Sequence, residues 1–197
     1  IESLCSTFQV DKVEEAYFVI WTTTPWTIPS NVAVCIHDEI EYIFVIGDKG
    51  HFIIAKELLD ACSDRWGMEL EILGSVLGKE ITEIVMAHPI YERESRLLHG
   101  DHVTTESGTG CVHTAPAHGL DDYFICIKNG LESVKALDNR GIFKEEYGPL
   151  SGLSTKKGDP IVIELLQDNN ALLAHQQYNH SYPHCWRHKS PVIFMST

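Results

Sequence analysis

Short runs of β-branched and aromatic residues recur along the first half of the chain, and they predict strands. Residues 31–36 (NVAVCI), 41–47 (EYIFVIG) and 51–55 (HFIIA) have the composition that is typical of strands. The sequence GDKG at 47–50 favours a tight turn, so the last two runs are expected to form a β-hairpin. Further strands are expected over residues 14–24, 69–74, 80–91 and 171–182.

Three segments show the features of helices. Residues 56–66 place apolar side chains at positions 58, 59, 62 and 66, which form one face of a helix. Residues 120–130 (LDDYFICIKNG) are expected to form a second helix that Gly130 ends. Asp159 is expected to cap a third helix, which begins with Pro160.

Many short strands with a few helices predict a mainly β fold with peripheral helices (α+β), built on a β-barrel core. The strands do not alternate with helices regularly enough for a doubly wound parallel sheet. The sequence contains no repeat, low-complexity tract or linker, so residues 1–197 are expected to form a single domain. The chain opens without Met and stops without an evident terminator, so we expect a segment excised from a longer protein.

The composition is ordinary for a soluble globular protein, with 44% hydrophobic and 22% charged residues. No apolar run approaches the roughly 20 residues that span a bilayer, and no signal peptide is visible, so we expect a cytoplasmic protein without membrane contact. The formal net charge is −13. Since nucleic-acid binders usually carry a basic face, any such contact is expected to be local, or to depend on other parts of a longer protein. The six cysteines are scattered, which favours reduced thiols.

The segment WTTTPWTIPSN (21–31) carries the first candidate site. Threonines favour strands, and Pro25 cannot donate to a sheet ladder, so we expect a strand to end here. Its last residues, Thr22, Thr23 and Thr24, would present a row of hydroxyls. Alternation would place the first and third threonines on one face and the second on the other. The alternative is that the threonines serve only as strand formers.

A second candidate site is the segment SGTGCVHTAPAHGLDDY (107–123), expected to be strand and loop before the helix. Its glycines lack the lysine of a P-loop and the spacing of a dinucleotide fingerprint, so they are expected to allow close backbone approach instead. His113 and Asp122 are the candidate functional side chains. Asp122 falls in the first turn of the predicted helix, where the helix dipole favours an ionised carboxylate that can bind an ammonium group. The neighbouring Asp121 is the alternative.

Residues 180–191 (HSYPHCWRHKSP) contain four possible zinc ligands, His180, His184, Cys185 and His188. A closed zinc site needs a second ligand pair, and no CxxC or similar pair is present, so no metal is expected here. A zinc-stapled structural domain is the alternative. The chain also lacks the GxSxG, HExxH and Walker A motifs. A hydrolase with this sequence would therefore use water as its nucleophile, positioned by hydroxyls and backbone amides.

The two segments WTTTPWTIPSN and GTGCVHTAPAHGLDDY together resemble the editing (CP1) domain of isoleucyl-tRNA synthetase of the bacterial type. This domain is inserted in the catalytic domain of a class I synthetase, and the resemblance covers essentially the whole chain. The related leucyl and valyl enzymes typically carry Arg after the threonines, whereas Pro25 and Trp26 stand here. Some relatives have a second Cys at the position of His188 and bind zinc there, so this difference also disfavours a metal.

The resemblance implies a β-barrel with peripheral helices that hydrolyses mischarged valyl-tRNA(Ile) and valyl-adenylate. A synthetic site that fits isoleucine cannot strongly reject valine, since one missing methylene is worth roughly 1–3 kcal/mol, and this enzyme is the established example of that limit. A second, smaller pocket would admit valine and exclude isoleucine. The implied partners are the 3′ end of tRNA(Ile) carrying valine, valyl-adenylate and the rest of the synthetase chain. ATP and magnesium are implied for the full-length enzyme, zinc is left open there, and no cofactor is expected in this domain.

The resemblance also assigns roles to single residues. Thr22, Thr23 and Thr24 would line the editing pocket and hold the carbonyl and a water molecule. Asp122 would bind the α-ammonium group, and it is grouped with the threonines as a catalytic candidate. His113 would border the side-chain pocket and help to exclude isoleucine. The substrate-binding candidates are Trp21, Thr27, Asn31 and His113.

Two other functions stay open from the sequence. The first is an editing domain of the valyl or leucyl type, which would hydrolyse threonyl-tRNA(Val) faster than valyl-tRNA(Ile). The second is a non-catalytic tRNA-positioning module. In that case an Asp122→Ala variant would turn over valyl-tRNA(Ile) normally and bind tRNA more weakly.

Overall fold

The computed structural model describes residues 1–178 and 182–196. These residues form two compact units, and each unit is described by itself below. Unit 1 consists of Ile1–Thr22, Ala33–His88 and Glu92–Thr114, and unit 2 consists of Thr23–Val32, Pro89–Tyr91 and the described part of Ala115–Thr197. The single domain expected from the sequence stays a prediction.

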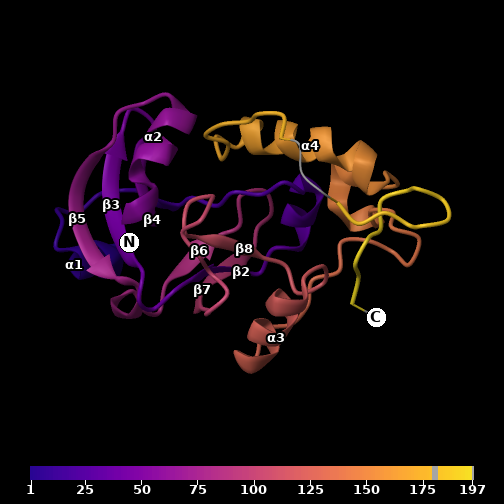
Figure 1. The fold of residues 1–197 in the computed structure, drawn as a ribbon, viewed down its shortest axis with the longest axis horizontal. Coiled ribbons are helices and arrows are strands. Elements are labelled where there is room, and N and C mark those ends of the chain that lie inside the picture. The colour runs from indigo at the N-terminus through magenta and orange to yellow at the C-terminus, as the bar shows by residue number, and fades with distance from the viewer. Residues whose placement is uncertain (179–181, 197) are drawn as a thin grey trace. The chain divides into compact units, whose positions relative to one another are not determined.

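The first sheet of unit 1 is built around the predicted hairpin (Figure 1). Its strands are β1 (Tyr17–Phe18), β3 (Glu41–Gly47), β4 (Gly50–Ala55) and β5 (Glu71–Leu77). The strand order is β1-β4-β3-β5, with β1 parallel to β4 and the other pairs antiparallel. Gly47 pairs with Gly50, so the turn falls where GDKG predicts it.

Helices contact both faces of this sheet. The described helices of unit 1 are α1 (Glu2–Phe8), η2 (Lys56–Leu58), α2 (Leu59–Trp66) and η3 (Gly78–Glu80). The ring of Phe8 in α1 lies 5.5 Å from that of Phe44, and the ring of Trp66 in α2 lies 5.6 Å from that of Phe52. Phe44 is paired with Ile53, the neighbour of Phe52, so strand alternation puts the two contacts on opposite faces.

A second sheet in unit 1 has the order β6-β7-β2-β8. Its strands are β2 (Ala33–Ile36), β6 (Val85–Ala87), β7 (Glu94–His99) and β8 (Val112–Thr114). β2 is buried along its whole length, as its apolar sequence predicts, and it runs parallel to β7 and antiparallel to β8. The sequence pattern does not predict β7, because ESRLLH mixes charged and apolar residues; Glu94 and Arg96 are exposed in the structure.

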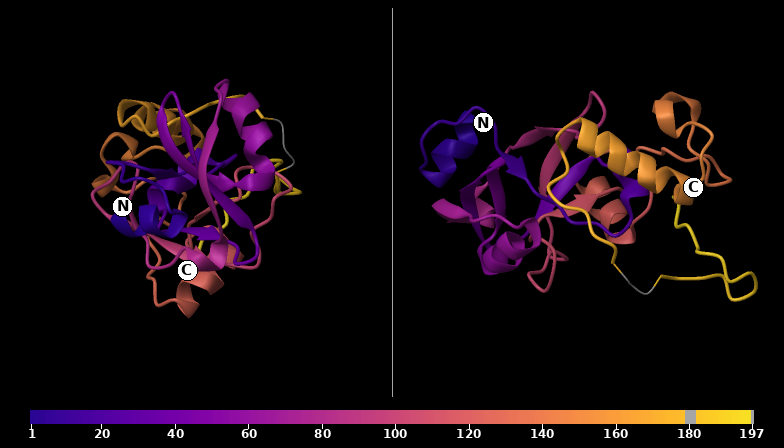
Figure 2. Two further views of the ribbon diagram at one scale, coloured as in Figure 1. Left: turned by 90° about the vertical axis from the view of Figure 1, so that its left-hand side faces the viewer. Right: turned by 90° about the horizontal axis from the view of Figure 1, so that it is seen from above.

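Unit 2 is built from helices and loops. Its described helices are η1 (Pro25–Ser30), α3 (Leu120–Lys128), η4 (Glu145–Leu150) and α4 (Thr155–Asp168), the long orange helix in Figure 2. Trp26 and Ile28 of η1 share one apolar core with Val162 and Leu166 of α4. This core therefore holds η1 against α4.

The predicted class, a mainly β fold with peripheral helices, is confirmed by these elements. Both sheets contain parallel and antiparallel pairs, so the expectation that the sheet is not doubly wound is also confirmed. The helices expected over residues 56–66 and 120–130 are present, and Gly130 follows the end of α3 with a φ of 67°.

The strand predicted over residues 14–24 is present only at Tyr17–Phe18, and the prediction is wrong on both sides of this pair. The carbonyl of Val19 accepts a hydrogen bond from the Thr109 hydroxyl at 2.5 Å, and this side-chain contact lies where the ladder stops. Residues 22–24 consequently lie in irregular backbone before η1, and the simple alternation predicted for their hydroxyls does not hold.

The cap predicted at Asp159 is also wrong. α4 begins at Thr155, more than a turn earlier, with Ser154 in the N-cap position and Pro160 inside the helix. The Asp159 carboxylate instead accepts a hydrogen bond from the backbone N–H of Trp26 at 2.9 Å. A carboxylate that looks like a local cap in the sequence therefore serves a segment far away along the chain.

Two strand predictions fail in part. Of the segment 80–91, only β6 forms a strand. Residues 171–178 form no strand, and residues 179–181 of the same prediction lie outside the described residues.

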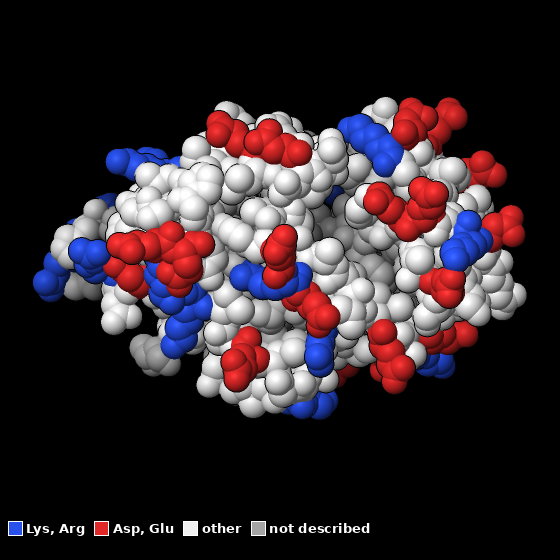
Figure 3. All heavy atoms as spheres, turned by 180° about the vertical axis from the view of Figure 1, so that it is seen from behind, with Lys and Arg blue, Asp and Glu red and all other residues white. Residues whose placement is uncertain are grey.

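The face of the molecule in Figure 3 carries acidic and basic side chains interspersed with one another. Both signs of charge are thus present on this face, although the formal net charge of the chain is −13. None of the helices in the described ranges has the length and apolar character needed to cross a membrane.

Candidate functional site

The loop 107–111 of unit 1, the SGTGC stretch of the second motif, is fixed mainly through its backbone. The carbonyl of Gly108 accepts hydrogen bonds from the Arg65 guanidinium at 3.2 Å and from the Cys62 thiol at 3.7 Å. The carbonyl of Thr109 accepts the N–H of Ala55 at 2.8 Å. These contacts tie the loop to α2 and to the end of β4.

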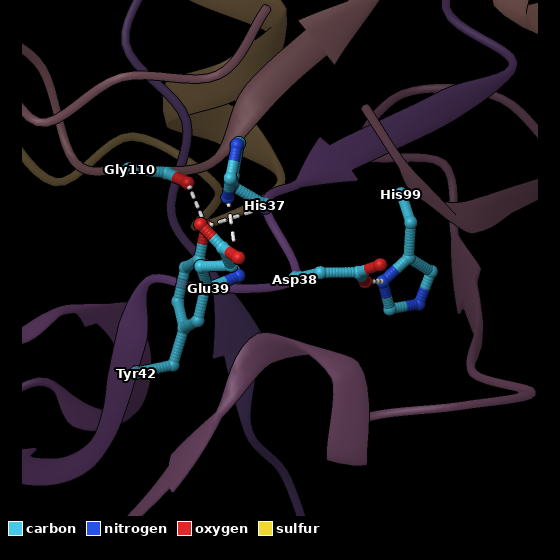
Figure 4. A network of polar contacts seen from close by, with 6 residues as sticks. All are labelled: His37, Asp38, Glu39, Tyr42, His99 and Gly110. Atoms are coloured by element: carbon cyan, nitrogen blue, oxygen red, sulfur yellow. Dashed lines mark hydrogen bonds and ion pairs between the residues drawn. The ribbon is translucent and has the colours of Figure 1, made fainter. Parts of the chain in front are cut away.

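Gly110 is the more closely packed of the two glycines in this loop. Its φ is 78°, and a Cβ at this position would lie 2.3 Å from the Cβ of Ala55. Its carbonyl accepts a hydrogen bond from the buried Tyr42 hydroxyl at 2.6 Å, and that hydroxyl accepts the N–H of His37 at 3.0 Å (Figure 4). The expectation that another group lies close to the loop backbone is thus confirmed at Gly110. The group that lies close is the side chain of Ala55 in the same protein.

The cysteines beside this loop are not activated nucleophiles. Burial raises the pKa of the Cys62 thiol to about 11, and it raises the pKa of the fully buried Cys111 thiol further. Because the thiolate is the reactive form, both thiols are inert at neutral pH. These two thiols are therefore not candidates for a nucleophile, and attack by water stays a prediction.

Three of the predicted site residues belong to unit 1: Trp21, Thr22 and His113. Trp21 packs beside the loop, since a Cβ on Gly108 would lie 3.5 Å from the Cβ of Trp21. His113 pairs with Val34 between β8 and β2, and its side chain is partly exposed. The loop and the second sheet therefore fix the backbone around both aromatic residues.

The other threonines lie in unit 2, around the start of η1. Thr23 and Thr24 are half-buried, and Thr24 occupies the N-cap position. The carbonyl of Thr24 accepts hydrogen bonds from the N–H of Thr27 at 3.0 Å and from its hydroxyl at 2.8 Å. Within unit 2 these two bonds bring Thr24 and Thr27 into direct contact. Thr27 and Asn31 are both buried.

A histidine in the second motif holds the other end of η1. The Nε2 atom of His118 lies 3.1 Å from the hydroxyl of buried Ser30, and its Nδ1 atom lies 3.0 Å from the carbonyl of Phe194. The His118 ring also meets the Trp26 ring edge-to-face at 4.8 Å. A carbonyl can only accept, so Nδ1 carries the proton and Nε2 accepts from Ser30, which in turn accepts the N–H of Ala136 at 3.3 Å.

We expect His118 to make stability depend on pH. Burial lowers the pKa of His118, so the unfolded chain, with a pKa of about 6.5, binds the proton more readily. The stability from neutral His118 is therefore complete above about pH 6.5 and is lost as the pH falls towards the lower pKa of the folded state. Between pH 7.5 and 5.5, wild type should lose about 1 kcal/mol more unfolding free energy than His118→Gln. Equal losses in urea titrations at the two pH values would contradict this role.

Asp122 lies in the first turn of α3, as predicted, and is half-buried. Its Oδ2 atom accepts the N–H of Ala115 at 2.8 Å, and a Cβ on Gly119 would touch its carboxyl group. Asp121, the alternative, is exposed. The structure therefore holds the Asp122 carboxylate in one place, at the N-terminal end of a helix where negative charge is favoured.

The zinc prediction concerns residues that the structure describes only in part. Cys185 Sγ lies 3.4 Å from His188 Nδ1, and His184 Nδ1 lies 2.7 Å from the carbonyl of Tyr182. His180 lies outside the described residues. Within residues 1–178 and 182–196, no three side chains of His, Cys, Asp or Glu are grouped as metal ligands would be. The absence of zinc stays a prediction.

A surface hollow of about 360 Å³ lies elsewhere in unit 1, beside the β3–β4 turn. It is lined by Ile46, Gly47, Asp48, Glu69, Leu70 and Glu71. None of the predicted site residues lines it, so we assign it no part in the site.

Sequence reasoning missed the residues that support the site. His118 stands in the quoted motif HTAPAHG but gives no local signal that distinguishes it from His113. Asp159 was interpreted as a helix cap, and Thr109 as part of a glycine-rich loop. Their partners, Ser30, Trp26 and Val19, are distant in sequence, so only the folded chain reveals these contacts.

Comparisons with known proteins give a consistent result. The chain is 41% identical over 200 residues to the isoleucine–tRNA ligase of Dichelobacter nodosus, covering all of this chain and 22% of that protein. It is 43% identical to that of Desulfovibrio desulfuricans (all of this chain, 21% of that protein) and 46% identical to that of Staphylococcus aureus (93% and 20%). The chain thus spans about a fifth of the length of these relatives. No family model matches the chain.

Solved structures with the same fold are similar at much lower identity. The crystal structure of GlLeuRS-CP1 has a TM-score of 0.71 with 17% identity, and the match covers 90% of each chain. The P. falciparum cytosolic leucyl-tRNA synthetase editing domain has a TM-score of 0.62 with 12% identity, over 85% of this chain and 88% of that one. At these identities the likeness establishes the fold.

Proposed function

From the premise that this chain is an editing domain of the isoleucyl/leucyl-tRNA synthetase type, homologous along its length to a segment of isoleucine–tRNA ligases, we propose that it hydrolyses valyl-tRNA(Ile). The observation that carries the proposal is the identity of 41–46% to isoleucine–tRNA ligases, against 12–17% to the leucyl structures. Valyl-adenylate is a second substrate by the same chemistry. The partners are the 3′ end of tRNA(Ile) and the rest of a synthetase chain, acting in the cytoplasm.

Selection is by size in the proposed reaction. Isoleucine differs from valine by one methylene. The binding free energy of one methylene is too small for a pocket that fits isoleucine to reject valine accurately. A pocket that clashes with the extra methylene can exclude isoleucine more strongly than a larger pocket can reject valine. His113 borders the valine side chain in this proposal, and Trp21, Thr27 and Asn31 support the bound aminoacyl end.

Water performs the attack in this mechanism. Thr22, Thr23 and Thr24 hold the ester carbonyl and the water molecule, and the developing negative charge on the carbonyl oxygen is stabilised by donors already in place. Asp122 binds the α-ammonium group of valine through a charge-assisted hydrogen bond. The inert thiols of Cys62 and Cys111 and the fully bonded imidazole of His118 support a mechanism without a covalent intermediate.

The direct test is a deacylation assay with the complete synthetase chain and purified aminoacyl-tRNAs. We expect rapid release of valine from valyl-tRNA(Ile) and slow release of isoleucine from isoleucyl-tRNA(Ile). Faster hydrolysis of threonyl-tRNA(Val) than of valyl-tRNA(Ile) would indicate the valyl type instead. Adding and removing zinc and magnesium in this assay also tests the proposal that the hydrolysis needs no cofactor.

Shortening His113 should weaken the size filter. We expect His113→Ala to raise hydrolysis of correctly charged isoleucyl-tRNA(Ile) about 10-fold, because the removed ring leaves room for roughly one further methylene. Valyl-tRNA(Ile) hydrolysis should change less. His99→Ala is the matched control, since His99 is a half-exposed histidine of β7 paired with Asp38 (Figure 4). If His113→Ala hydrolyses isoleucyl-tRNA(Ile) as slowly as wild type does, His113 does not exclude isoleucine from the pocket.

A further inference from the structure

The helix α3 of unit 2 carries an apolar stripe that is exposed in the structure. The side chains of this stripe are spaced three or four residues apart, so they lie on one side of the helix. They are Leu120, Tyr123, Phe124 and Ile127, with exposed fractions of 72%, 37%, 61% and 56%. A helix of a globular protein normally turns such a stripe towards a core, so its exposure needs an explanation.

The other side of α3 holds the helix in unit 2. Cys126 is completely buried, and Asp122 Oδ2 accepts the N–H of Ala115 at 2.8 Å. A small thiol and a carboxylate of α3 are thus turned inward, whereas its largest apolar side chains face outward.

The stripe has the composition of a protein interface. The rings of Tyr123 and Phe124 meet edge-to-face with their centroids 5.8 Å apart, and aliphatic side chains lie before and after them in the stripe. None of the four side chains is charged. The centre of a protein–protein interface is rich in aromatic residues and poor in charged ones, and a contiguous exposed apolar patch is typical of such a surface.

The charges of α3 favour protein over nucleic acid as the occupant. The helix has two acidic residues, Asp121 and Asp122, and one basic residue, Lys128. Because a nucleic-acid backbone is bound mainly by Lys and Arg, this helix lacks the charges that would attract it. A helix that lies on a membrane surface also carries Lys and Arg on its polar face. The stripe therefore fits an apolar protein surface best.

The comparisons indicate where such a surface can come from. This chain spans about a fifth of the length of the isoleucine–tRNA ligases that it matches, so most of such a synthetase lies outside it. The last described residues run close to α3: the N–H of Ser196 donates to the carbonyl of Ala117 at 2.8 Å, three residues before the helix begins. Any chain that follows Ser196 therefore leaves unit 2 near the N-terminal end of α3.

We propose that the apolar stripe of α3 docks onto the part of the synthetase chain that lies outside residues 1–197. The occupant is an apolar surface of the same polypeptide. This inference goes beyond the proposed function, because it needs a longer synthetase chain but not the hydrolysis of valyl-tRNA(Ile). Since Asp122 stands on the same helix, docking also fixes this carboxylate relative to the rest of the enzyme.

Photo-cross-linking in the complete synthetase chain identifies the occupant. Phe124→p-benzoylphenylalanine keeps an aromatic ring at an exposed position, so we expect the variant to fold. Irradiation should join residue 124 to a peptide outside residues 1–197, and mass spectrometry of the digest locates the bond. The same replacement at exposed Asn129, about 140° further around the helix, is the matched control and should give little of this product.

Thiol labelling of the complete chain measures how well the stripe is covered. We expect Ile127→Cys to react with iodoacetamide about 10-fold more slowly than Asn129→Cys, because a thiol must be accessible to react. Both positions lie at the C-terminal end of α3, so their thiols have a comparable setting. The ratio of the two rates should depend neither on protein concentration nor on added tRNA.

The outcomes separate the possible occupants. Equal labelling rates at the two positions, or a cross-link confined to residues 1–197, would overturn the proposal. Protection that needs tRNA would make nucleic acid the occupant, and protection that grows with protein concentration would make it a second copy; either result also overturns it. Neither measurement needs editing activity, so a synthetase that fails to hydrolyse valyl-tRNA(Ile) would refute the proposed function and leave this docking surface to be decided separately.

Discussion

Replacing Asp122 by asparagine in the complete synthetase is expected to slow valyl-tRNA(Ile) hydrolysis about 100-fold, because an ammonium group taken out of water loses its only full counter-charge in the proposed complex. Asparagine can still accept the N–H of Ala115 that Asp122 Oδ2 accepts at 2.8 Å. The start of α3 should therefore keep its structure, and the change isolates the charge. Single-turnover deacylation at saturating enzyme measures the effect.

Asp121→Asn is the matched control, since Asp121 is the preceding carboxylate and is exposed. We expect it to hydrolyse valyl-tRNA(Ile) at nearly the wild-type rate. A full rate in Asp122→Asn, and also in Asp122→Ala, together with weaker tRNA binding, would support the non-catalytic tRNA-positioning module and remove the role given to Asp122.

The second large effect is expected on stability. Gly110→Ala should cost about 3 kcal/mol or more of unfolding free energy, because alanine is strained at a φ of 78° and its Cβ would lie 2.3 Å from the Cβ of Ala55. The displaced loop would also lose the bond between the Tyr42 hydroxyl and the Gly110 carbonyl. Urea unfolding followed by tryptophan fluorescence measures the loss.

Gly67→Ala separates the two causes. Gly67 has a similar φ of 65°, but nothing lies within 4 Å of a Cβ placed there. It should therefore show only the cost of the backbone conformation, about 1 kcal/mol. If the two variants are equally stable, close packing of Gly110 against Ala55 does not contribute to the fold.

The parts of the fold predicted from the sequence are those set by local signals. The hairpin was predicted because two apolar runs flank the turn GDKG, and both α2 and α3 because their apolar spacing is helical. The strand predicted through residues 22–24 is absent: β1 ends at Phe18, and the carbonyl of the next residue, Val19, accepts the Thr109 hydroxyl. No local pattern in the sequence indicates that contact, because its two partners are 90 residues apart.

The candidate site divides in the same way. The position of Asp122 at the start of a helix follows from the residues around it, and the structure agrees. The support given by Asp159 and His118 could not be predicted, because their partners Trp26 and Ser30 are 133 and 88 residues away in sequence. The spacing of a motif can indicate candidate site residues. It carries little information on which distant side chains form hydrogen bonds to the segments that contain them.

The backbone anchoring of the loop 107–111 has a consequence for protein engineering. Gly108 and Gly110 have φ values of 81° and 78°, and a Cβ on Gly110 would lie 2.3 Å from the Cβ of Ala55, so a larger residue at either position would displace a loop whose carbonyl oxygens are already bonded. A library that seeks a different amino-acid preference should leave these codons constant. Its diversity belongs at partly exposed positions such as His113, where we expect a change of side-chain shape to cost the fold less than at the buried glycines.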